Sequence, residues 1–429
     1  MNRVAVREFV APGLSVPPGE VLIPTELGDP VYGALPCPAA PLVAGTLQRK
    51  GKRAEHGPAG QCSDPSGDEG GPVLFAATCQ LRDGTMAAVA AAASRADRVA
   101  VAEARSAVDE WAGVFGTRRL LAGPSPWCSG AVQALGRARQ AVAGGPVVHI
   151  YGQLAAGPDT TSELAGKGAV FVGSLDEVPD GATVVFPAHG VPADVLARAA
   201  ARGLDIMDAT CPLVRGVHAE ARKFAERGDD LVLIGQAGHT AVPGITGQAP
   251  ARTTVVATPA STAGLRVADP RQVSYLLQPG IPLEDSAPVV AALRSRFPAL
   301  RGPHPDGFCY AASDRAASVR AIAAASDVMF VLGAADSPDS RQISTFARDC
   351  GAHTHIIAAA GDIVPAMLSG ASTIGLAEST SASRALAGQV TEALSGLGPL
   401  SVATRRVSTD VTAAPGPAAA GAEGTPAAS

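Results

Sequence analysis

Features that would quickly assign a protein class are scarce in this sequence. There is no uninterrupted apolar run of about 18 residues, which predicts that no helix spans a membrane. The first residues, MNRVAVREFV, carry charges where a secretory signal needs an apolar core, so we expect a cytoplasmic protein. Charged residues make up only 17% of the chain and the net charge is -5, which excludes the basic surface that nucleic acids require.

Two common redox signatures are missing as well. No two of the seven cysteines form a CxxC pair, and disulfides are not expected in a reducing cytoplasm, so the cysteines are either metal ligands or buried thiols. No GxGxxG motif lies between a predicted strand and a predicted helix, so the chain has no evident flavin or nicotinamide site. Electrons for any redox reaction must then come from outside, and a ferredoxin or flavodoxin is the implied partner.

What is present indicates several folded parts. With 429 residues, of which 47% are hydrophobic, the chain can form two to four domains. Residues 1–71 are rich in Pro and Gly, and their aperiodic end, 48–71, predicts a disordered linker. The tail, 408–429, has too little apolar content to fold. Between the linker and the main body, 72–116 predict a short α/β extension, with strands at 72–78 and 98–104 and helices at 86–96 and 106–116.

The segment from 117 to 407 repeats one pattern three times, which divides it into three lobes at 117–205, 206–302 and 303–407. Each lobe has a cysteine, an amphipathic helix and a continuous apolar strand, followed by further strands and helices. Continuous apolar strands that alternate with helices predict parallel sheets covered on both faces. The expected fold class is therefore α/β, with three pseudo-repeated lobes whose strand-end loops surround a central cavity.

One cysteine stands between a strand and a helix in each lobe: Cys128, Cys211 and Cys309. A helix start favours thiolate over thiol through its unpaired N–H groups and the positive end of its dipole. Three thiolates can hold an iron–sulfur cluster and leave one iron open for a substrate oxygen. A lone cysteine is more often a buried thiol, but three at matching points favour the ligand interpretation. The unmatched cysteines are interpreted as structural or incidental: Cys37, Cys62, Cys79 and Cys350.

Four sequence blocks resemble one enzyme family. DATCPLVRGVH at Cys211, GFCYAASDR at Cys309, FPAHG at His189 and IGQAGH at His239 are similar to 4-hydroxy-3-methylbut-2-enyl diphosphate reductases, often called LytB or IspH. The resemblance covers about residues 120–387 and implies a three-lobed fold with a [4Fe-4S] cluster on the three matched cysteines. The family's reaction binds the allylic hydroxyl of the substrate to the open iron and expels it as water, which gives isopentenyl and dimethylallyl diphosphate.

The sequence departs from the family's pattern at the substrate site. Ala156 and Gly157 stand at the His and Asn of the family's HxxxHN element, and Ala241 replaces the glutamate that relays protons. Pro279 and Gly280 stand where hydroxyls are expected. Loss of a positioned acid alone costs about 10²–10⁴-fold in rate.

The third lobe departs from the pattern too. The family's SSN becomes Ser337, Pro338 and Asp339, and Asp314 follows Ser313 in place of an Asn. Thr380 stands roughly where a phosphate-binding serine belongs. Two new carboxylates would face a substrate with several negative charges, and one like-charge pair at about 4 Å costs on the order of 4 kcal/mol at an effective dielectric of about 20.

His189 and His239 match the histidines of the family's pattern and lie in Gly-containing loops at the ends of predicted strands. We interpret them as substrate contacts or proton donors. Further substrate-site candidates come from the third lobe and its entry: Ser313, Asp314, Ser337, Asp339 and Thr380. For the two aspartates the alternative is an exposed loop or cap position, and for Ser337 it is an ordinary surface serine.

Three hypotheses for the function stay open. The chain is a cluster-dependent reductase that performs the family's reaction, a paralogue that reduces a different small molecule with fewer phosphates, or a non-catalytic iron–sulfur sensor. The altered pocket favours the second. Turnover of the family's substrate, a spectral response to another metabolite, or a cluster without any turnover would separate the three.

Overall fold

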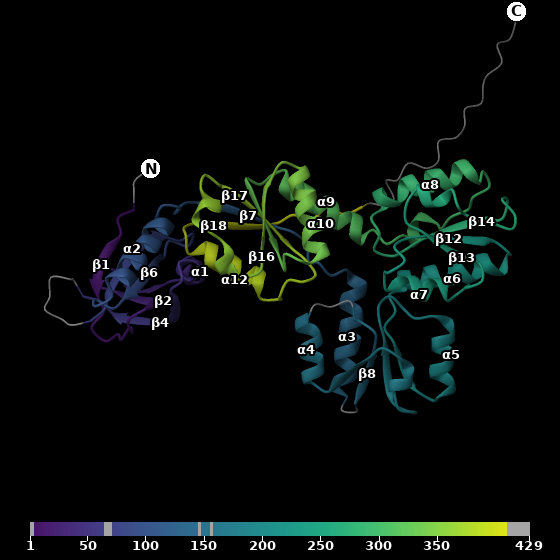
Figure 1. Ribbon diagram of the computed structural model, residues 1–429, viewed down its shortest axis with the longest axis horizontal. Coiled ribbons are helices and arrows are strands. Elements are labelled where there is room, and N and C mark those ends of the chain that lie inside the picture. Colours follow the sequence, from purple (N-terminus) through teal and green to yellow (C-terminus); the bar gives the residue numbers. More distant parts are fainter. Residues whose placement is uncertain (1–3, 64–70, 145–146, 155–157, 410–429) are drawn as a thin grey trace, which may run out of the picture. The chain divides into compact units, whose positions relative to one another are not determined.

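The computed structural model describes residues 4–63, 71–144, 147–154 and 158–409 (Figure 1). These residues fall into two compact units. Unit 1 comprises the described residues of 1–188, 204–209 and 315–407. Unit 2 comprises the described residues of 189–203, 210–314 and 408–429.

The N-terminal part of unit 1 is a six-stranded sheet with two helices, called here the N-terminal sheet. Its strand order is β1-β5-β6-β2-β3, and β4 pairs in parallel with β2. The elements are β1 (Arg7–Val10), β2 (Glu20–Asp29), β3 (Gly33–Pro36), α1 (Ala40–Arg49), β4 (Arg53–Gln61), β5 (Val73–Gln80), β6 (Met86–Ala93) and α2 (Arg98–Ala112).

The N-terminal sheet corrects two predictions. The helix expected at 86–96 is wrong, because residues 86–93 form strand β6. Alanine prefers a helix by less than about 1 kcal/mol per residue, which tertiary pairing readily overrides. Here β6 pairs with both β5 and β2, and nearly all of its side chains are buried. The linker expected at 48–71 is wrong where β4 lies, and residues 64–70 lie outside the described part of the chain.

The two elements expected at 98–104 and 106–116 are a single helix, α2. Asp97 begins this helix, because its side chain accepts the N–H groups of Val99 and Ala100. The strand expected at 72–78 is confirmed as β5.

Three parallel sheets follow, as predicted. The first, β11-β10-β8-β9, and the third, β16-β15-β17-β7-β18, lie in unit 1, and the second, β13-β12-β14, lies in unit 2. Their strands are β7 (Arg118–Ala122), β8 (Val148–Tyr151), β9 (Ala169–Val172), β10 (Thr183–Phe186), β11 (Asp205–Asp208), β12 (Asp230–Ile234), β13 (Thr253–Val256), β14 (Val273–Leu277), β15 (Val328–Leu332), β16 (His353–Ile357), β17 (Thr373–Glu378) and β18 (Leu400–Thr404).

Helices alternate with these strands, as expected for parallel sheets. The α-helices are α3 (Ser129–Ala143), α4 (Pro158–Gly166), α5 (Ala193–Ala201), α6 (Pro212–Glu226), α7 (Ala241–Thr246), α8 (Leu283–Arg296), α9 (Ala311–Ala323), α10 (Pro338–Asp349), α11 (Pro365–Leu368) and α12 (Leu386–Ser395). Short 3₁₀ turns are η1 (Leu175–Glu177), η2 (Ala260–Thr262), η3 (Pro305–Gly307) and η4 (Ala360–Asp362). No helix among the described residues is long and apolar enough to cross a bilayer.

The segment before each matched cysteine pairs with one parallel sheet, and the helix after that cysteine packs on another. β7, before Cys128, pairs with β17 and β18 of the third sheet. β11, before Cys211, pairs with β10 of the first sheet. Arg301, before Cys309, forms a parallel bridge with Ser274 of the second sheet. The helix after each cysteine packs on the next sheet, as α3 does on β8 and α6 on β12.

The predicted lobe boundaries are therefore displaced by one strand from the sheets. The predicted start of the lobe at 117–205 is wrong, because its first strand, β7, belongs to the third sheet. Its expected end also falls at the start of β11, which completes the first sheet. Sequence periodicity located the repeated pattern, but it could not show on which side of each cysteine a sheet ends.

The N-terminal sheet and the third sheet share one apolar core within unit 1. Trp111 of α2 packs in the same cluster as Leu376 of β17 and Leu386 of α12. Helix α1 also packs against η4, where a methyl group added to Gly45 would lie 2.0 Å from the carbonyl oxygen of Gly361. The N-terminal sheet is thus built into this part of unit 1 and is not a tethered module.

Candidate functional site

Each matched cysteine lies at or just before the start of a helix. Cys128 is the N-cap residue of α3, and its sulfur accepts the N–H of Ala131 at 3.4 Å. Cys211 is the N-cap residue of α6, which begins with Pro212. Cys309 precedes α9 by two residues. The sulfur of Cys128 thus contacts a helical N–H, whereas the side chain of Cys211 makes no cap hydrogen bond.

The cysteines differ in burial. All seven are among the described residues, and none is paired in a disulfide. Cys128 is exposed, and Cys211 and Cys309 are half-buried. In the N-terminal sheet, burial raises the pKa of Cys37 to about 12 and that of Cys62 to about 11. Cys79 and Cys350 are half-buried too, so exposure alone does not single out the matched cysteines, whereas Cys37 and Cys62 are enclosed in an apolar cluster.

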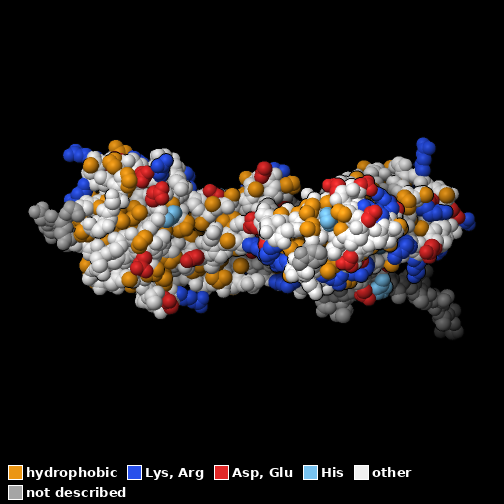
Figure 2. Space-filling model, turned by 90° about the horizontal axis from the view of Figure 1, so that it is seen from below, with side chains coloured by type: hydrophobic (Ala, Val, Ile, Leu, Met, Phe, Trp, Pro, Cys, Tyr) orange, Lys and Arg blue, Asp and Glu red, His pale blue; other side chains and the backbone are white. Residues whose placement is uncertain are grey.

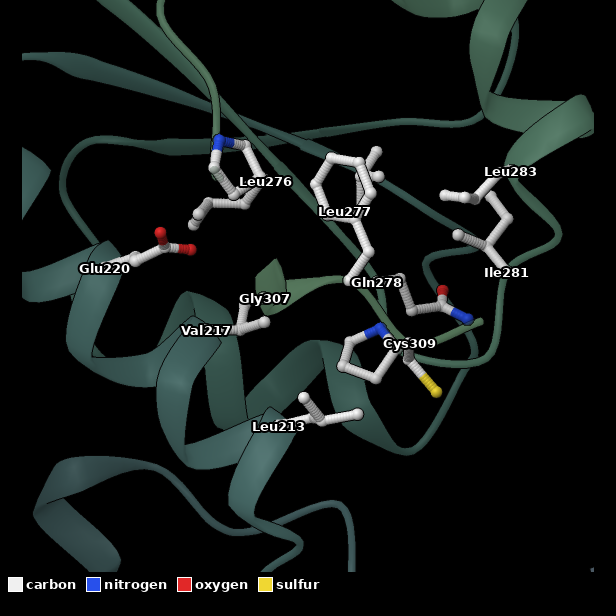
Figure 3. Close-up of a pocket in the computed structure, with 13 residues that line it drawn as sticks. Leu213, Val217, Glu220, Leu276, Leu277, Gln278, Ile281, Leu283, Gly307 and Cys309 are labelled. Carbon is white, nitrogen blue, oxygen red and sulfur yellow. The ribbon is translucent and has the colours of Figure 1, made fainter. Parts of the chain in front are cut away.

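Cys128 belongs to unit 1, and Cys211 and Cys309 belong to unit 2. Within unit 2, α6 packs against η3, so the start of α6 and the segment leading to Cys309 lie together. They border one small cavity, lined among others by Leu213, Gln278 and Cys309 (Figure 3). Its volume of about 10 Å³ is near the lower limit for one water molecule. Among the described residues, no group of three His, Cys, Asp or Glu side chains is placed to hold a metal ion.

The structure brings the two predicted histidines together in unit 2. The ring centroids of His189 and His239 are 5.0 Å apart. Nδ1 of His189 is hydrogen-bonded to Oγ1 of Thr240 at 2.6 Å, and Nδ1 of His239 accepts the N–H of Ala241 at 3.1 Å. An Nδ1 that accepts leaves the proton of a neutral His239 ring on Nε2.

Burial keeps both imidazoles neutral. It lowers the pKa of His189 to about 4, and the neighbouring charge of His239 acts in the same direction. Burial also lowers the pKa of His239. At neutral pH the pair therefore offers hydrogen bonds to a ligand but no positive charge.

Local packing explains why these loops contain glycine. Gly190, next to His189, has φ +70°, and a Cβ there would lie 2.6 Å from the ring of His218. His218 is a buried residue of α6. Ala241, where the family has its glutamate, is fully buried in an apolar cluster under α7.

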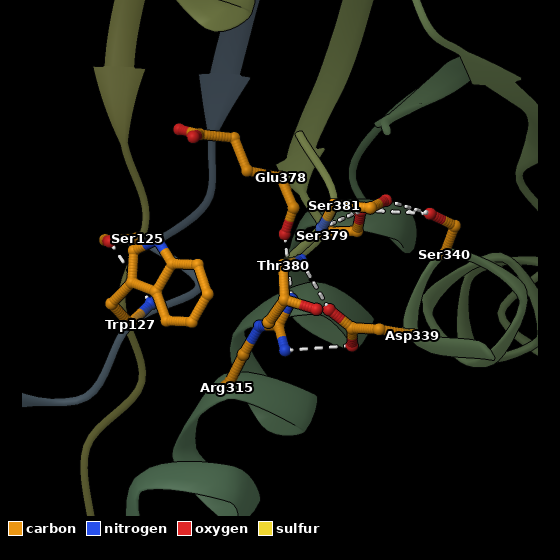
Figure 4. Close-up of polar contacts among 9 residues, drawn as sticks. All are labelled: Ser125, Trp127, Arg315, Asp339, Ser340, Glu378, Ser379, Thr380 and Ser381. Carbon is orange, nitrogen blue, oxygen red and sulfur yellow. Dashed lines mark hydrogen bonds and ion pairs between the residues drawn. The ribbon is translucent and has the colours of Figure 1, made fainter. Parts of the chain in front are cut away.

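The predicted residues of the third sheet meet at the ends of β15 and β17 (Figure 4). The carboxylate of Asp339 pairs with both terminal nitrogens of Arg315, at 3.0 and 3.1 Å. It also accepts the backbone N–H of Thr380 at 2.7 Å. Arg315 donates further to the carbonyl of Glu378 at 2.8 Å. Of the two interpretations of Asp339, the structure shows a charge-paired residue in the first turn of α10, where Ser337 is the N-cap.

Three serine hydroxyls form a closed cluster beside this ion pair. Ser379 and Ser381 are 2.7 Å apart, and Ser340 donates to Ser379 at 2.9 Å. Ser381 accepts the N–H of Ala334 at 3.0 Å. Ser340 and Ser379 are fully buried. These hydroxyls point toward one another, as Figure 4 shows.

Ser313 and Asp314 precede Arg315 in α9, but they form hydrogen bonds with other residues of unit 2. The hydroxyl of Ser313 accepts the N–H of Leu283 at 2.8 Å, and Asp314 accepts the N–H of Thr409 at 2.7 Å. Both therefore stabilise local backbone. Two other positions from the family comparison, Ala156 and Gly157, lie outside the described residues.

Sequence reasoning missed Arg315 and Glu378. Arg315 ends the GFCYAASDR block, so its place one turn into a helix was readable, but its partner Asp339 is 24 residues away. Glu378 is the last residue of β17, and burial raises its pKa. Its side chain borders a cavity of about 460 Å³ that is also lined by Thr391, Glu392 and Val402. The apolar run of β17 gave no sign of this cavity.

Comparison with known proteins identifies the family and the fold. Residues 120–395 match the family model described as LytB protein. A 4-hydroxy-3-methylbut-2-enyl diphosphate reductase 2 from Mycobacterium bovis is 42% identical over 68% of this chain and 90% of its own length. A reductase of the same name from Aromatoleum aromaticum is 39% identical over 66% of this chain and 92% of its own. The solved structure of the Plasmodium falciparum E-1-hydroxy-2-methyl-but-2-enyl-4-diphosphate reductase has a TM-score of 0.59, 23% identity, and covers 67% of this chain and 92% of its own.

Proposed function

The chain belongs to the LytB protein family, and on this basis we propose that it is an iron–sulfur reductase that removes a hydroxyl group from a small molecule. The observation that carries the proposal is the position of the cysteines. Each of Cys128, Cys211 and Cys309 follows a segment paired to one parallel sheet and lies at or near the start of the next helix. Three thiols at equivalent points of a repeated pattern are typical of ligands to one shared cofactor, and less typical of three thiols with unrelated roles.

The donor set fits a [4Fe-4S] cluster in kind and number. Cys128, Cys211 and Cys309 would hold it, since thiolates are its ligands and helix starts favour thiolates. Bound there, the cluster would supply electrons and a Lewis-acidic iron for a substrate oxygen. The relatives named as reductases of 4-hydroxy-3-methylbut-2-enyl diphosphate support this class of reaction.

The reaction balances with an external electron source. A carbon–oxygen bond of the substrate breaks, one proton joins the leaving oxygen to form water, and a second proton joins the carbon. Two electrons arrive one at a time from a ferredoxin or flavodoxin. On the face shown in Figure 2, Lys and Arg side chains lie among Asp and Glu side chains.

The residues of unit 2 would orient the substrate. His239 holds a proton on Nε2 while its Nδ1 accepts the N–H of Ala241. His189 is fixed through Thr240. As a neutral ring, His239 would donate a hydrogen bond from Nε2 to a substrate oxygen, and Nε2 of His189 would donate or accept according to the tautomer that its Nδ1 bond to Thr240 sets.

Purification under argon tests the proposal. We expect a brown protein with about four irons and four sulfides per chain. With a one-electron donor, it should consume an allylic alcohol and release water. The assay should compare 4-hydroxy-3-methylbut-2-enyl diphosphate with the same alcohol lacking the diphosphate. Colourless, iron-free protein would overturn the proposal, and a stable cluster without turnover of either alcohol would favour a sensor.

A further inference from the structure

At the ends of β15 and β17 of the third sheet, the carboxylate of Asp339 accepts three hydrogen bonds from within the chain. Three elements converge on Asp339: Arg315 of α9 with two nitrogens, the N–H of Thr380 after β17, and the first turn of α10, in which Asp339 itself lies. The side chains of Arg315 and Asp339 are only 21% and 20% exposed. The pair is therefore largely withdrawn from solvent.

These groups would bind an anion if Asp339 were absent. A guanidinium presents two parallel N–H groups that match a carboxylate or a phosphate. Backbone N–H groups at strand ends and helix starts add partial positive charge in the same direction. Asp339 already accepts from Arg315 and from the N–H of Thr380 within the chain.

The neighbouring hydroxyls offer no substitute. Ser340, Ser379 and Ser381 bond to one another, and the first two are fully buried. A Cβ on Gly333 would lie 2.0 Å from the Ser379 hydroxyl, so the cluster is tightly enclosed. A phosphate group could reach these oxygens only by breaking this network.

The two histidines of unit 2 do not add positive charge at pH 7. Partial burial lowers the pKa of both His189 and His239, and Ala241 beside them is apolar and fully buried. These three residues therefore do not neutralise a diphosphate.

We propose that Asp339 is a specificity-determining residue that fills the anion site of the third sheet, so that the substrate is an alcohol without a diphosphate group. This inference rests on the proposed function for its reaction type. A diphosphate would bring its charge next to Asp339 and find Arg315 already paired. A hydroxyl or amine group could instead donate to the carboxylate.

Calorimetric titration of inorganic pyrophosphate into the full-length protein at pH 7 tests the inference. Asp339→Asn keeps the shape of the side chain and frees Arg315 and the Thr380 N–H. We expect this variant to bind pyrophosphate about tenfold or more tightly than the unaltered protein, because a charge-assisted partner replaces a like charge. Asp336→Asn, an exposed neighbour in the same loop, changes the net charge equally and should bind as the unaltered protein does.

Two further variants distinguish the effect of the Asp339 charge from a loss of folding. Asp339→Glu keeps the negative charge and should still exclude pyrophosphate. If Asp339→Asn melts too early to titrate, Asp339→Ser provides the same freed donors with a smaller side chain. A folded Asp339→Asn protein whose affinity for pyrophosphate equals that of the unaltered protein would overturn the inference.

The titration needs no cluster, so it separates the two proposals. A gain in pyrophosphate affinity in iron-free protein would uphold the role of Asp339 while the proposed function fails. Iron-loaded protein that reduces the diphosphate ester faster than the free alcohol would refute the inference and leave the reductase assignment intact.

Discussion

The N-terminal sheet and the three parallel sheets place the same residue types in opposite settings. In the N-terminal sheet, Cys37 and Cys62 are buried in an apolar cluster, where burial raises their pKa values to about 12 and about 11. In the parallel region, Cys128 is exposed at a helix start. Cys37 and Cys62 also stand directly after strands, β3 and β4, so a strand end by itself does not expose a side chain. Cys128 instead begins helix α3 and is exposed, so the packing around a position, more than the residue type, makes a thiol available for chemistry.

Cysteine substitutions should show the largest difference between the two regions. Cys211→Ser should abolish iron binding, because a serine hydroxyl does not ionise to replace a thiolate ligand. Cys79→Ser, in the N-terminal sheet, should retain full iron, since burial raises the pKa of Cys79 to about 11. Iron and sulfide content with the visible spectrum measures both. Unchanged iron in Cys211→Ser would refute the ligand assignment.

Ala241→Glu tests the first residue of α7, which is as fully buried as the core residues of the N-terminal sheet. Restoring this glutamate alone should leave turnover of 4-hydroxy-3-methylbut-2-enyl diphosphate about 10²-fold or more below that of the relatives, because Ala156 and Pro279 also differ. The new carboxyl should also lower the melting temperature, since Ala241 is fully buried among apolar residues. Ala260→Glu, at an exposed position of the same unit, is the control for stability. A single variant with the relatives' rate would contradict this expectation.

The contact between the N-terminal sheet and the third sheet can be broken at one glycine. Gly45→Ala should lower the free energy of unfolding by about 1–3 kcal/mol, because the methyl group would overlap the carbonyl of Gly361. Gly13→Ala is the matched control, since a methyl group there meets no described atom within 4 Å. Urea unfolding measures both variants. Equal stability would show that the two sheets do not share a core.

The smallest expected effect is a difference in how the unfolding free energy of two histidine variants depends on pH. The folded state lowers the pKa of His189 to about 4, so the unfolded chain binds an extra proton between about pH 6.5 and pH 4. This contribution to stability is complete above pH 6.5 and is lost as the pH falls. His189→Gln should reduce the loss between pH 7 and pH 5 by on the order of 1 kcal/mol, because the ring is only partly buried.

His56 of strand β4 is the matched control for this measurement, because it is exposed in the N-terminal sheet. The unfolding free energies of His189→Gln and His56→Gln should be compared between pH 7 and pH 5. Identical profiles for both variants would show that His189 is not desolvated in solution.

The sequence predicted the parallel region better than the N-terminal sheet for a physical reason. Continuous apolar strands between amphipathic helices have a strong local pattern, so β12, β15 and β17 were readable from the chain. The alanine run of β6 has no such pattern, and its pairing with β5 and β2 decides its conformation. Boundaries were harder still, because β7 pairs with strands about 250 residues later in the chain.

In the candidate site, too, some residues could be predicted from the sequence and others only from the tertiary structure. Matching positions in a repeat singled out Cys128, Cys211 and Cys309, and strand-end glycine loops singled out His189 and His239. Sequence alone thus determined the α/β class, the three cysteines and the family resemblance, since all depend on local order along the chain. Tertiary structure alone decided that Arg315 neutralises Asp339, that Ala241 is buried and that the N-terminal sheet joins the third sheet's core. Those outcomes depend on contacts between residues far apart in the sequence, and no local sequence pattern predicts such contacts.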